Sequence, residues 1–260
     1  MKKLIAMICL TVMVLTVNSG CGNDDVALKE IRDRGKLKVG VKTDVPGFGF
    51  YDSSTKEHEG LEIDLARLIA SDILGDAKAV EFIGVTAQTR GPMLENGELD
   101  MVIATFTITD ERKEMYNFTQ PYYHDEIGFL VRSESNIQSI SDIGGKTIGI
   151  AQSGTAKSAL EAESGRLGIE LILSERASYP ELKAALSSGE IDAFCVDKSI
   201  LTGYRDDKTR ILEDGFNPQD YGIATKLEKK QLAKYLDDYL ASIMKDGKFE
   251  EILIRWDRVQ

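Results

Sequence analysis

A short pattern that occurs twice constrains the fold of this chain more than any other sequence feature. Asn96-Gly97-Glu98-Leu99-Asp100 precedes an apolar run at 101–104, and Ser188-Gly189-Glu190-Ile191-Asp192 precedes a second run at 193–196. Each copy is typical of a helix that ends at glycine and is followed by a central strand. Two copies about ninety residues apart predict two similar α/β halves, each with its own sheet.

Strand and helix patterns alternate through the rest of the chain. Such alternation predicts βαβ units with mostly parallel sheets. By apolar periodicity, strands are expected at 36–42, 80–83, 101–104, 128–132, 147–151, 170–173, 191–196 and 221–225. Helices are expected at 61–74, 92–96, 155–164, 180–188, 198–204, 232–244 and 249–256.

Two passages, at 128–132 and 221–225, are predicted to cross between the halves as hinge strands. One lobe then comprises 36–128 together with 226–260, and the other comprises 132–220. A cleft between two lobes that are joined in this way can close by hinging.

The first twenty residues read as a secretory signal. Lys2 and Lys3 precede an apolar run at 4–17, which is too short for a membrane span, and small residues lead to Cys21. A cysteine at this place is typical of a lipoprotein, although Asn18 stands where an apolar residue is expected. The mature chain is therefore predicted to be exported, to the periplasm or cell surface. It is either anchored through a lipid on Cys21, with 21–35 as tether and lead-in, or cleaved and free.

The charge of the mature chain disfavours nucleic acid and anionic membranes as partners. Without Lys2 and Lys3, 30 basic residues stand against 43 acidic ones, a net charge near −13. No later apolar run approaches the ~20 residues of a span. Cys195 lies in an apolar strand, IDAFCVD, so we expect a buried thiol and no disulfide framework.

The segment after the run at 101–104 is suited to hold a carboxylate. Thr105, Thr107 and Thr109 alternate along it, and Arg112 follows at a helix start. Strand ends of open α/β sheets face the ligand crevice, and a guanidinium matches two carboxylate oxygens. The alternative is a helix cap at Thr109 and a solvated surface arginine.

Other candidate residues follow the ends of predicted strands. Thr155 opens a helix, whose N-terminus favours anions, or it is a plain N-cap. Asp197 ends a strand and suits an ammonium group, or it caps the next helix. Lys42 ends the first strand. Arg90 stands at a helix start, where the helix dipole disfavours a cation, which indicates another role.

Common catalytic patterns are missing from the sequence. It contains no G-x-S-x-G, H-E-x-x-H or C-x-x-C, and its two histidines, His58 and His124, are far apart. We therefore expect neither an enzyme nor a bound metal or cofactor.

From about 36 to 256 the chain resembles a family 3 extracellular solute-binding protein, the polar amino acid receptors of ABC importers. The motifs that carry the resemblance are GLEIDLARLIA, NGELDMVIATFTITDERKEMYNFTQPYY, SDIGGKTIGIAQSGT, SGEIDAFCVDKS and YGIAT. The aspartate/glutamate receptors look most similar, through VKTDVP, TRGP, VDKSIL and QDYGI. The resemblance implies an α/β, type II periplasmic-binding fold and a monomer that works with permease subunits.

The resemblance also implies a role for each candidate residue. Arg112 would bind the ligand α-carboxylate, and Asp197 the α-ammonium. Lys42 and Arg90 would bind a side-chain carboxylate. The further contacts implied are Thr107, the backbone at Thr105, the helix opened by Thr155, and Tyr221 on the hinge. Ala156 departs from the pattern, because several relatives have a second threonine there.

The charges of these residues favour an acidic ligand. Three cations stand against one carboxylate, so a neutral amino acid would leave a cation unmatched in a closed cleft. Aspartate or glutamate is therefore the predicted ligand. The alternatives are another polar amino acid such as glutamine or cysteine, a cyclohexadienyl dehydratase-like enzyme, or a sensor or adhesin whose amino acid site is secondary.

Overall fold

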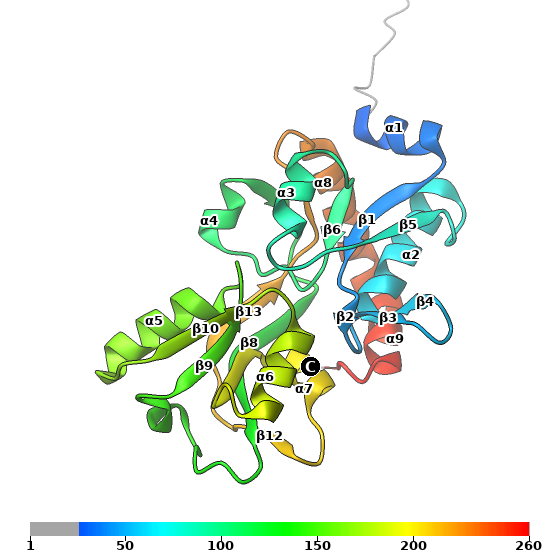
Figure 1. Ribbon diagram of the computed structural model, residues 1–260. Coiled ribbons are helices and arrows are strands. Elements are labelled where there is room, and N and C mark those ends of the chain that lie inside the picture. The colour runs from blue at the N-terminus through cyan, green and yellow to red at the C-terminus, as the bar shows by residue number, and fades with distance from the viewer. Residues whose placement is uncertain (1–25, 260) are drawn as a thin grey trace, which may run out of the picture.

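The first sheet is five-stranded and supports the upper lobe in Figure 1. The computed structural model describes residues 26–259. In spatial order the strands are β5 (Val80–Gly84), β1 (Leu37–Val41), β6 (Met101–Ile103), β14 (Ala224–Lys226) and β7 (Tyr116–Phe118). Strands β1, β5 and β6 are parallel, and β14 is antiparallel to both β6 and β7.

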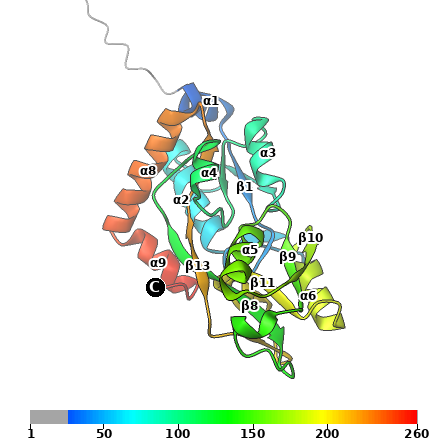
Figure 2. The same cartoon turned by 90° about the vertical axis from the view of Figure 1, so that its left-hand side faces the viewer.

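Helices and a small three-stranded sheet complete this lobe. The antiparallel sheet consists of β2 (Asp44–Val45), β3 (Gly49–Asp52) and β4 (Glu57–Glu59). Figure 2 shows the C-terminal helices α8 and α9 along one side of the lobe. The helices are α1 (Val26–Arg34), α2 (Leu61–Leu74), α3 (Arg90–Glu95), α4 (Asp110–Lys113), α8 (Lys230–Lys245) and α9 (Lys248–Arg255).

The second sheet is six-stranded and supports the other lobe. Its spatial order is β10 (Ile172–Arg176), β9 (Thr147–Ala151), β11 (Ala193–Asp197), β8 (Tyr123–Arg132) and β12 (Thr209–Ile211), while β13 (Phe216–Tyr221) also pairs with β8. The helices of this lobe are η1 (Ile140–Ile143), α5 (Ala156–Leu167), α6 (Tyr179–Ser188) and α7 (Lys198–Tyr204). Cys195 is completely buried in β11, as predicted.

The repeated pattern has the same structural role in both lobes. The Asp100 carboxylate accepts a hydrogen bond from the backbone N–H of Lys38, at 2.7 Å. In the second lobe, the Asp192 carboxylate accepts from the N–H of Thr147, at 2.9 Å. Each aspartate thus ties the start of its central strand to the neighbouring parallel strand, which explains why this residue follows the glycine turn in both copies.

The chain passes between the sheets twice, close to the middle of the molecule. Strand β7 ends at Phe118 in the first sheet and β8 begins at Tyr123 in the second, while β13 ends at Tyr221 and β14 begins at Ala224. The return passage lies inside the range 221–225. The first crossing was predicted wrongly, because 128–132 lies within β8 and pairs with β11 and β12.

Residues 26–34 also depart from the sequence expectation. They were predicted to belong to a tether, but they form helix α1. Ala27, Leu28 and Ile31 are buried in the core of the first lobe, in contact with α2 and α8. The predicted signal and Cys21 lie outside the described residues. No helix between residues 26 and 259 is both long and apolar enough to cross a bilayer.

Candidate functional site

A small enclosed cavity of about 20 Å³ lies between the two lobes. Ala87, Arg90, Thr105 and Thr107 line it from the first lobe, and Ala151, Gly154, Thr155, Ala156, Tyr179, Val196 and Asp197 from the second. A larger pocket of about 620 Å³, which includes Arg112, adjoins it between α3, α4 and α5. Five of the eight predicted ligand-binding residues therefore line one cavity, and a sixth lies at its edge.

Arg90 is held from behind by main-chain carbonyls. Its side chain is only 3% exposed, and Nη1 donates to the carbonyl oxygens of Ala104 at 2.6 Å and Thr105 at 3.0 Å. The guanidinium also stacks on the Phe106 ring, 4.1 Å from its centroid. Burial lowers the pKa of Arg90. Its Nε has no hydrogen-bond partner within the described residues, so the cavity wall contains an unused buried donor.

Thr105 has an unusual backbone conformation beside Arg90. Its φ of +45° lies in the left-handed region, which costs a non-glycine residue about 1–3 kcal/mol. The main chain is fixed on both sides: the N–H donates to Glu62 Oε1 at 2.5 Å, and the carbonyl accepts from Arg90. The buried Thr105 hydroxyl has no partner among the described residues. Arg90 and Thr105 thus present two adjacent unused polar groups.

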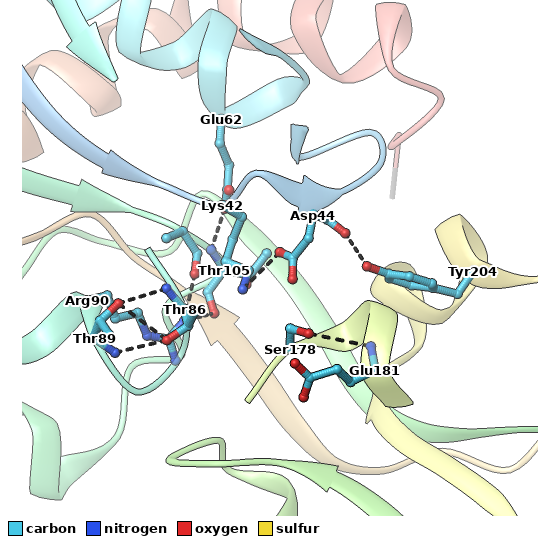
Figure 3. A network of polar contacts seen from close by, with 11 residues as sticks. Lys42, Asp44, Glu62, Thr86, Thr89, Arg90, Thr105, Ser178, Glu181 and Tyr204 are labelled. Atoms are coloured by element: carbon cyan, nitrogen blue, oxygen red, sulfur yellow. Dashed lines mark hydrogen bonds and ion pairs between the residues drawn. The ribbon is translucent and has the colours of Figure 1, made fainter. Parts of the chain in front are cut away.

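Glu62 is a buried carboxylate behind this wall. It comes from the first turn of α2 and has no exposed surface (Figure 3). Oε1 accepts from the Thr105 N–H and from the Tyr122 hydroxyl, each at 2.5 Å. Burial raises the pKa of Glu62 to about 7, although both hydrogen bonds and the charges of Arg90 and Lys42 oppose this rise. The site therefore contains a buried carboxylate that does not itself line the ligand cavity.

Arg112 joins the two lobes. Thr109 accepts a hydrogen bond from the Arg112 N–H and caps the short helix α4, as the alternative interpretation of the sequence proposed. The guanidinium is not a free surface group, however. Nη1 donates to the Thr107 carbonyl at 2.8 Å, and Nη2 to the Ser153 carbonyl of the other lobe at 3.3 Å. Burial lowers the pKa of Arg112 to about 9.

Asp197 belongs to a pair of carboxyls around the Tyr221 hydroxyl. That hydroxyl contacts Asp197 Oδ2 and lies 3.1 Å from Asp125 Oδ2. Burial, and then the charge of Asp125, raise the pKa of Asp197 to about 7. Ser199 donates its N–H and hydroxyl to Asp125. Asp197 stands at the N-cap position of helix α7, as the alternative interpretation proposed, but its carboxylate makes no capping bond and contacts Tyr221 instead.

Gln219 connects the threonines of the two lobes. Its buried Oε1 accepts from the Thr107 hydroxyl at 2.8 Å and from the Thr155 hydroxyl at 2.7 Å. Thr155 stands at the N-cap position of α5, but its hydroxyl makes no capping bond and donates to Gln219 instead. One amide oxygen therefore joins β13 to both sides of the cavity.

Lys42 is paired with Asp44 and does not line the cavity. The two side chains form an ion pair at 3.0 Å, and Lys42 is only 2% exposed (Figure 3). Its Nζ lies 4.6 Å from the centroid of the Tyr179 ring in the other lobe. The Tyr204 hydroxyl, also from the second lobe, donates to the Asp44 carbonyl. Burial is the main cause that lowers the pKa of Lys42.

A family model for bacterial extracellular solute-binding proteins, family 3, matches residues 37–258. The chain belongs to this family. The glutamine-binding protein GlnH of the ABC transporter of Bacillus subtilis is 35% identical, over 98% of this chain and 97% of that protein. A glutamine-binding protein of Geobacillus stearothermophilus is 38% identical, over 80% and 79%. The glutamate-binding protein GluB of Corynebacterium glutamicum is 29% identical, over 85% and 78%.

Solved structures agree with this assignment to the family 3 solute-binding proteins. The cysteine-binding protein from Campylobacter jejuni superimposes with a TM-score of 0.81 at 27% identity, over 88% of this chain and 92% of that one. The type II periplasmic-binding fold is thereby confirmed. The relatives are solute-binding proteins, which agrees with the prediction that this family member is not an enzyme. No cluster of three metal-ligating side chains occurs within residues 26–259.

Four residues of this solute-binding protein's site were missed by the sequence analysis: Glu62, Asp125, Tyr179 and Gln219. Glu62 left a signal, because it stands in line with Ala66, Ile69 and Ile73 on the buried side of α2. A charged residue in that helical row needs a buried partner. The other three gave no comparable signal, since their partners come from the opposite lobe or from distant strands.

Proposed function

We propose that the protein is the receptor of an ABC importer and captures a polar amino acid with an uncharged side chain, glutamine in the first place. Two relatives that bind glutamine are 35% and 38% identical to it. The observation that carries the proposal is a pair of carboxylates, the fully buried Glu62 and the half-buried Asp44, next to the cations that the sequence assigned to an acidic side chain.

These carboxylates change the charge balance that favoured aspartate or glutamate. Lys42 is already matched by Asp44 at 3.0 Å, and Glu62 lies behind Arg90 on the same wall. The sequence-based count included Asp197 as the only carboxylate. With Asp44, Glu62 and Asp125 added, the site has no excess of positive charge to offer a second ligand carboxylate.

The hydrogen-bonding groups of the cavity wall also suit an amide. Arg90 Nε can only donate, whereas the Thr105 hydroxyl can donate or accept, and neither has a partner in the described structure. A side-chain amide supplies an acceptor for the first and a donor for the second. A carboxylate can also accept from both groups, so these two groups alone do not distinguish glutamine from glutamate, and the choice between them rests on the charge balance.

The amino acid backbone of the ligand would be held across the cleft. We assign the α-carboxylate to Arg112 together with the N-terminus of α5, and the α-ammonium to Asp197. These groups come from different lobes, so a ligand that binds both stabilises the closed arrangement. As the receptor of an importer, the protein would deliver the bound amino acid to the permease subunits. Lipid anchoring through Cys21 stays a prediction.

Calorimetry on protein freed of bound amino acids tests the proposal. We expect glutamine to bind at least tenfold more tightly than glutamate, asparagine, cysteine or arginine at pH 8.5. Asp197→Asn should weaken every amino acid, because it removes the partner of the shared ammonium group. Tighter binding of glutamate than of glutamine by the unaltered protein would contradict the assignment.

Glutamate is the second candidate, because the unused Arg90 Nε would also suit a carboxylate oxygen and a glutamate-binding relative exists at 29% identity. The same titrations separate the two ligands directly.

A further inference from the structure

Glu62 lies one layer behind the ligand cavity and is connected to two residues of its wall. Its carboxylate accepts a hydrogen bond from the Thr105 N–H, and the Thr105 carbonyl accepts one from Nη1 of Arg90. Its own Oε2 has no hydrogen-bond partner among the described residues. One buried oxygen of the carboxylate, close to the cations of the site, therefore accepts no hydrogen bond from the described residues.

We propose that Glu62 is a specificity-determining residue: its negative charge offsets Arg90 and makes the site reject ligands with an anionic side chain. This inference rests on the proposed function, namely that the cleft between the lobes, which must open beyond this small cavity to admit a ligand, holds a polar amino acid by its side chain at Arg90 and Thr105. Glu62 does not touch the ligand itself. It acts through the charge of the wall and through the position of Thr105.

The other carboxylates near the site are not suited to this role in specificity. Asp197 also acts on Arg90, but it would pair with the ligand ammonium, which glutamine and glutamate share. Asp44 is paired with Lys42, and Asp125 is bonded to Ser199. Glu62 is thus the carboxylate that neither pairs with the ligand ammonium nor forms an ion pair of its own, so its charge should weigh most on the second carboxylate of an acidic ligand.

Replacing the Glu62 carboxylate with the isosteric amide of glutamine tests this proposal, because it leaves the shape of the side chain unchanged. Glu62→Gln retains an oxygen that can accept from Thr105 and removes the charge. At pH 8.5 we expect the ratio of the glutamate Kd to the glutamine Kd to fall by about tenfold or more relative to the unaltered protein. Tyr122→Phe is the matched control, because it removes a hydrogen bond from the same Glu62 oxygen and keeps the charge. It should leave the ratio unchanged within about twofold.

The outcomes separate this inference from the proposed function. If the unaltered protein prefers glutamate, or binds neither ligand, the proposed function is wrong whatever Glu62 does. If it prefers glutamine and Glu62→Gln weakens both ligands equally, Glu62 is merely structural and the inference is overturned. A fall of the ratio in Tyr122→Phe equal to that in Glu62→Gln would also overturn it, because geometry would then explain the effect.

If Glu62→Gln does not fold, the pH dependence of ligand binding by the unaltered protein tests the inference instead. Glu62 is surrounded by Arg90, Lys42 and Tyr122, and burial raises its pKa to about 7. Protonation on lowering the pH from 8.5 to 5.5 removes its charge, so the glutamate Kd should improve relative to the glutamine Kd by about tenfold. Asp197 titrates in the same range and also acts on Arg90, so the same titration of Asp197→Asn is the control, and the ratio should shift there as well. A ratio that is constant over this range would refute the inference.

Discussion

The buried carboxyls Asp197 and Glu62 should make the free energy of unfolding depend on pH. Burial is the main cause that raises their pKa values, from 3.8 and 4.5 respectively, to about 7. Between about pH 4 and pH 7 the folded protein therefore binds more protons than the unfolded chain does. The unfolding free energy is then expected to fall as the pH rises through this range, and to level off above it.

The expected size follows from these values. One pKa unit corresponds to about 1.4 kcal/mol, so each carboxyl should lower the unfolding free energy by about 2–3 kcal/mol between pH 5 and pH 8. This is a large part of the 5–15 kcal/mol that is typical of a folded domain. Because the Tyr221 hydroxyl lies between Asp197 and Asp125, the proton that titrates belongs to this pair.

Urea unfolding at pH 5, 6, 7 and 8, followed by circular dichroism in buffer without amino acids, measures the effect. Asp197→Asn should remove about 2–3 kcal/mol of the difference between pH 5 and pH 8. Asp206→Asn is the control, because the Asp206 carboxylate is exposed and a hydrogen bond from Lys183 lowers its pKa to about 2. Its contribution changes only below about pH 4, so the variant should keep the full dependence between pH 5 and 8. An unfolding free energy of the unaltered protein that is constant over this range, or a full dependence in Asp197→Asn, would refute the reasoning.

Three further predictions concern other parts of the site and the core. Arg112→Lys should weaken amino acid binding more than tenfold by calorimetry, since lysine lacks the planar fork that spans a carboxylate; an unchanged Kd would remove Arg112 from the site. Gln219→Leu should lower the unfolding free energy by about 1–3 kcal/mol in urea, because two buried threonine hydroxyls lose their acceptor; unaltered stability would contradict this. Cys195, whose pKa is raised by burial, should react with a thiol reagent only as fast as the protein unfolds; rapid labelling of Cys195 in native buffer, located by peptide mapping because Cys21 can also react, would contradict its burial.

Much of the fold could be predicted because its signals are local. The predicted bounds at 61–74, 147–151 and 198–204 coincide with α2, β9 and α7. Strand β8 was identified only in its apolar second half, because its first half reads Tyr123-His124-Asp125-Glu126. Those polar residues are strand because β13 pairs with them, and β13 lies about ninety residues further along the chain.

The parts of the site that sequence spacing revealed are those at strand ends and helix starts. Thr105, Thr155 and Asp197 were found in this way, since such positions converge on the crevice of an α/β fold. The side chains that contact Thr155 and Asp197 could not be predicted from the sequence. The Thr155 hydroxyl bonds to Gln219, and Asp197 contacts Tyr221, in both cases across distances in sequence that no periodicity encodes.

The charge of the ligand is the property that sequence reasoning could least decide, and the reason is physical. A count of residues that face a ligand treats each of them as if it were alone with that ligand, but buried charges interact with every charge that low polarity leaves unscreened. Lys42 counts as a ligand cation only if Asp44 is ignored, and Arg90 only if Glu62 is ignored. Asp44 is only two residues from Lys42 in the sequence, but Glu62 reaches the wall of Arg90 only because α2 packs beside Thr105, so the net charge of the cavity is in part a property of the tertiary structure. Specificity for the side chain should therefore depend on the residues behind the wall as well as on the residues that touch the ligand.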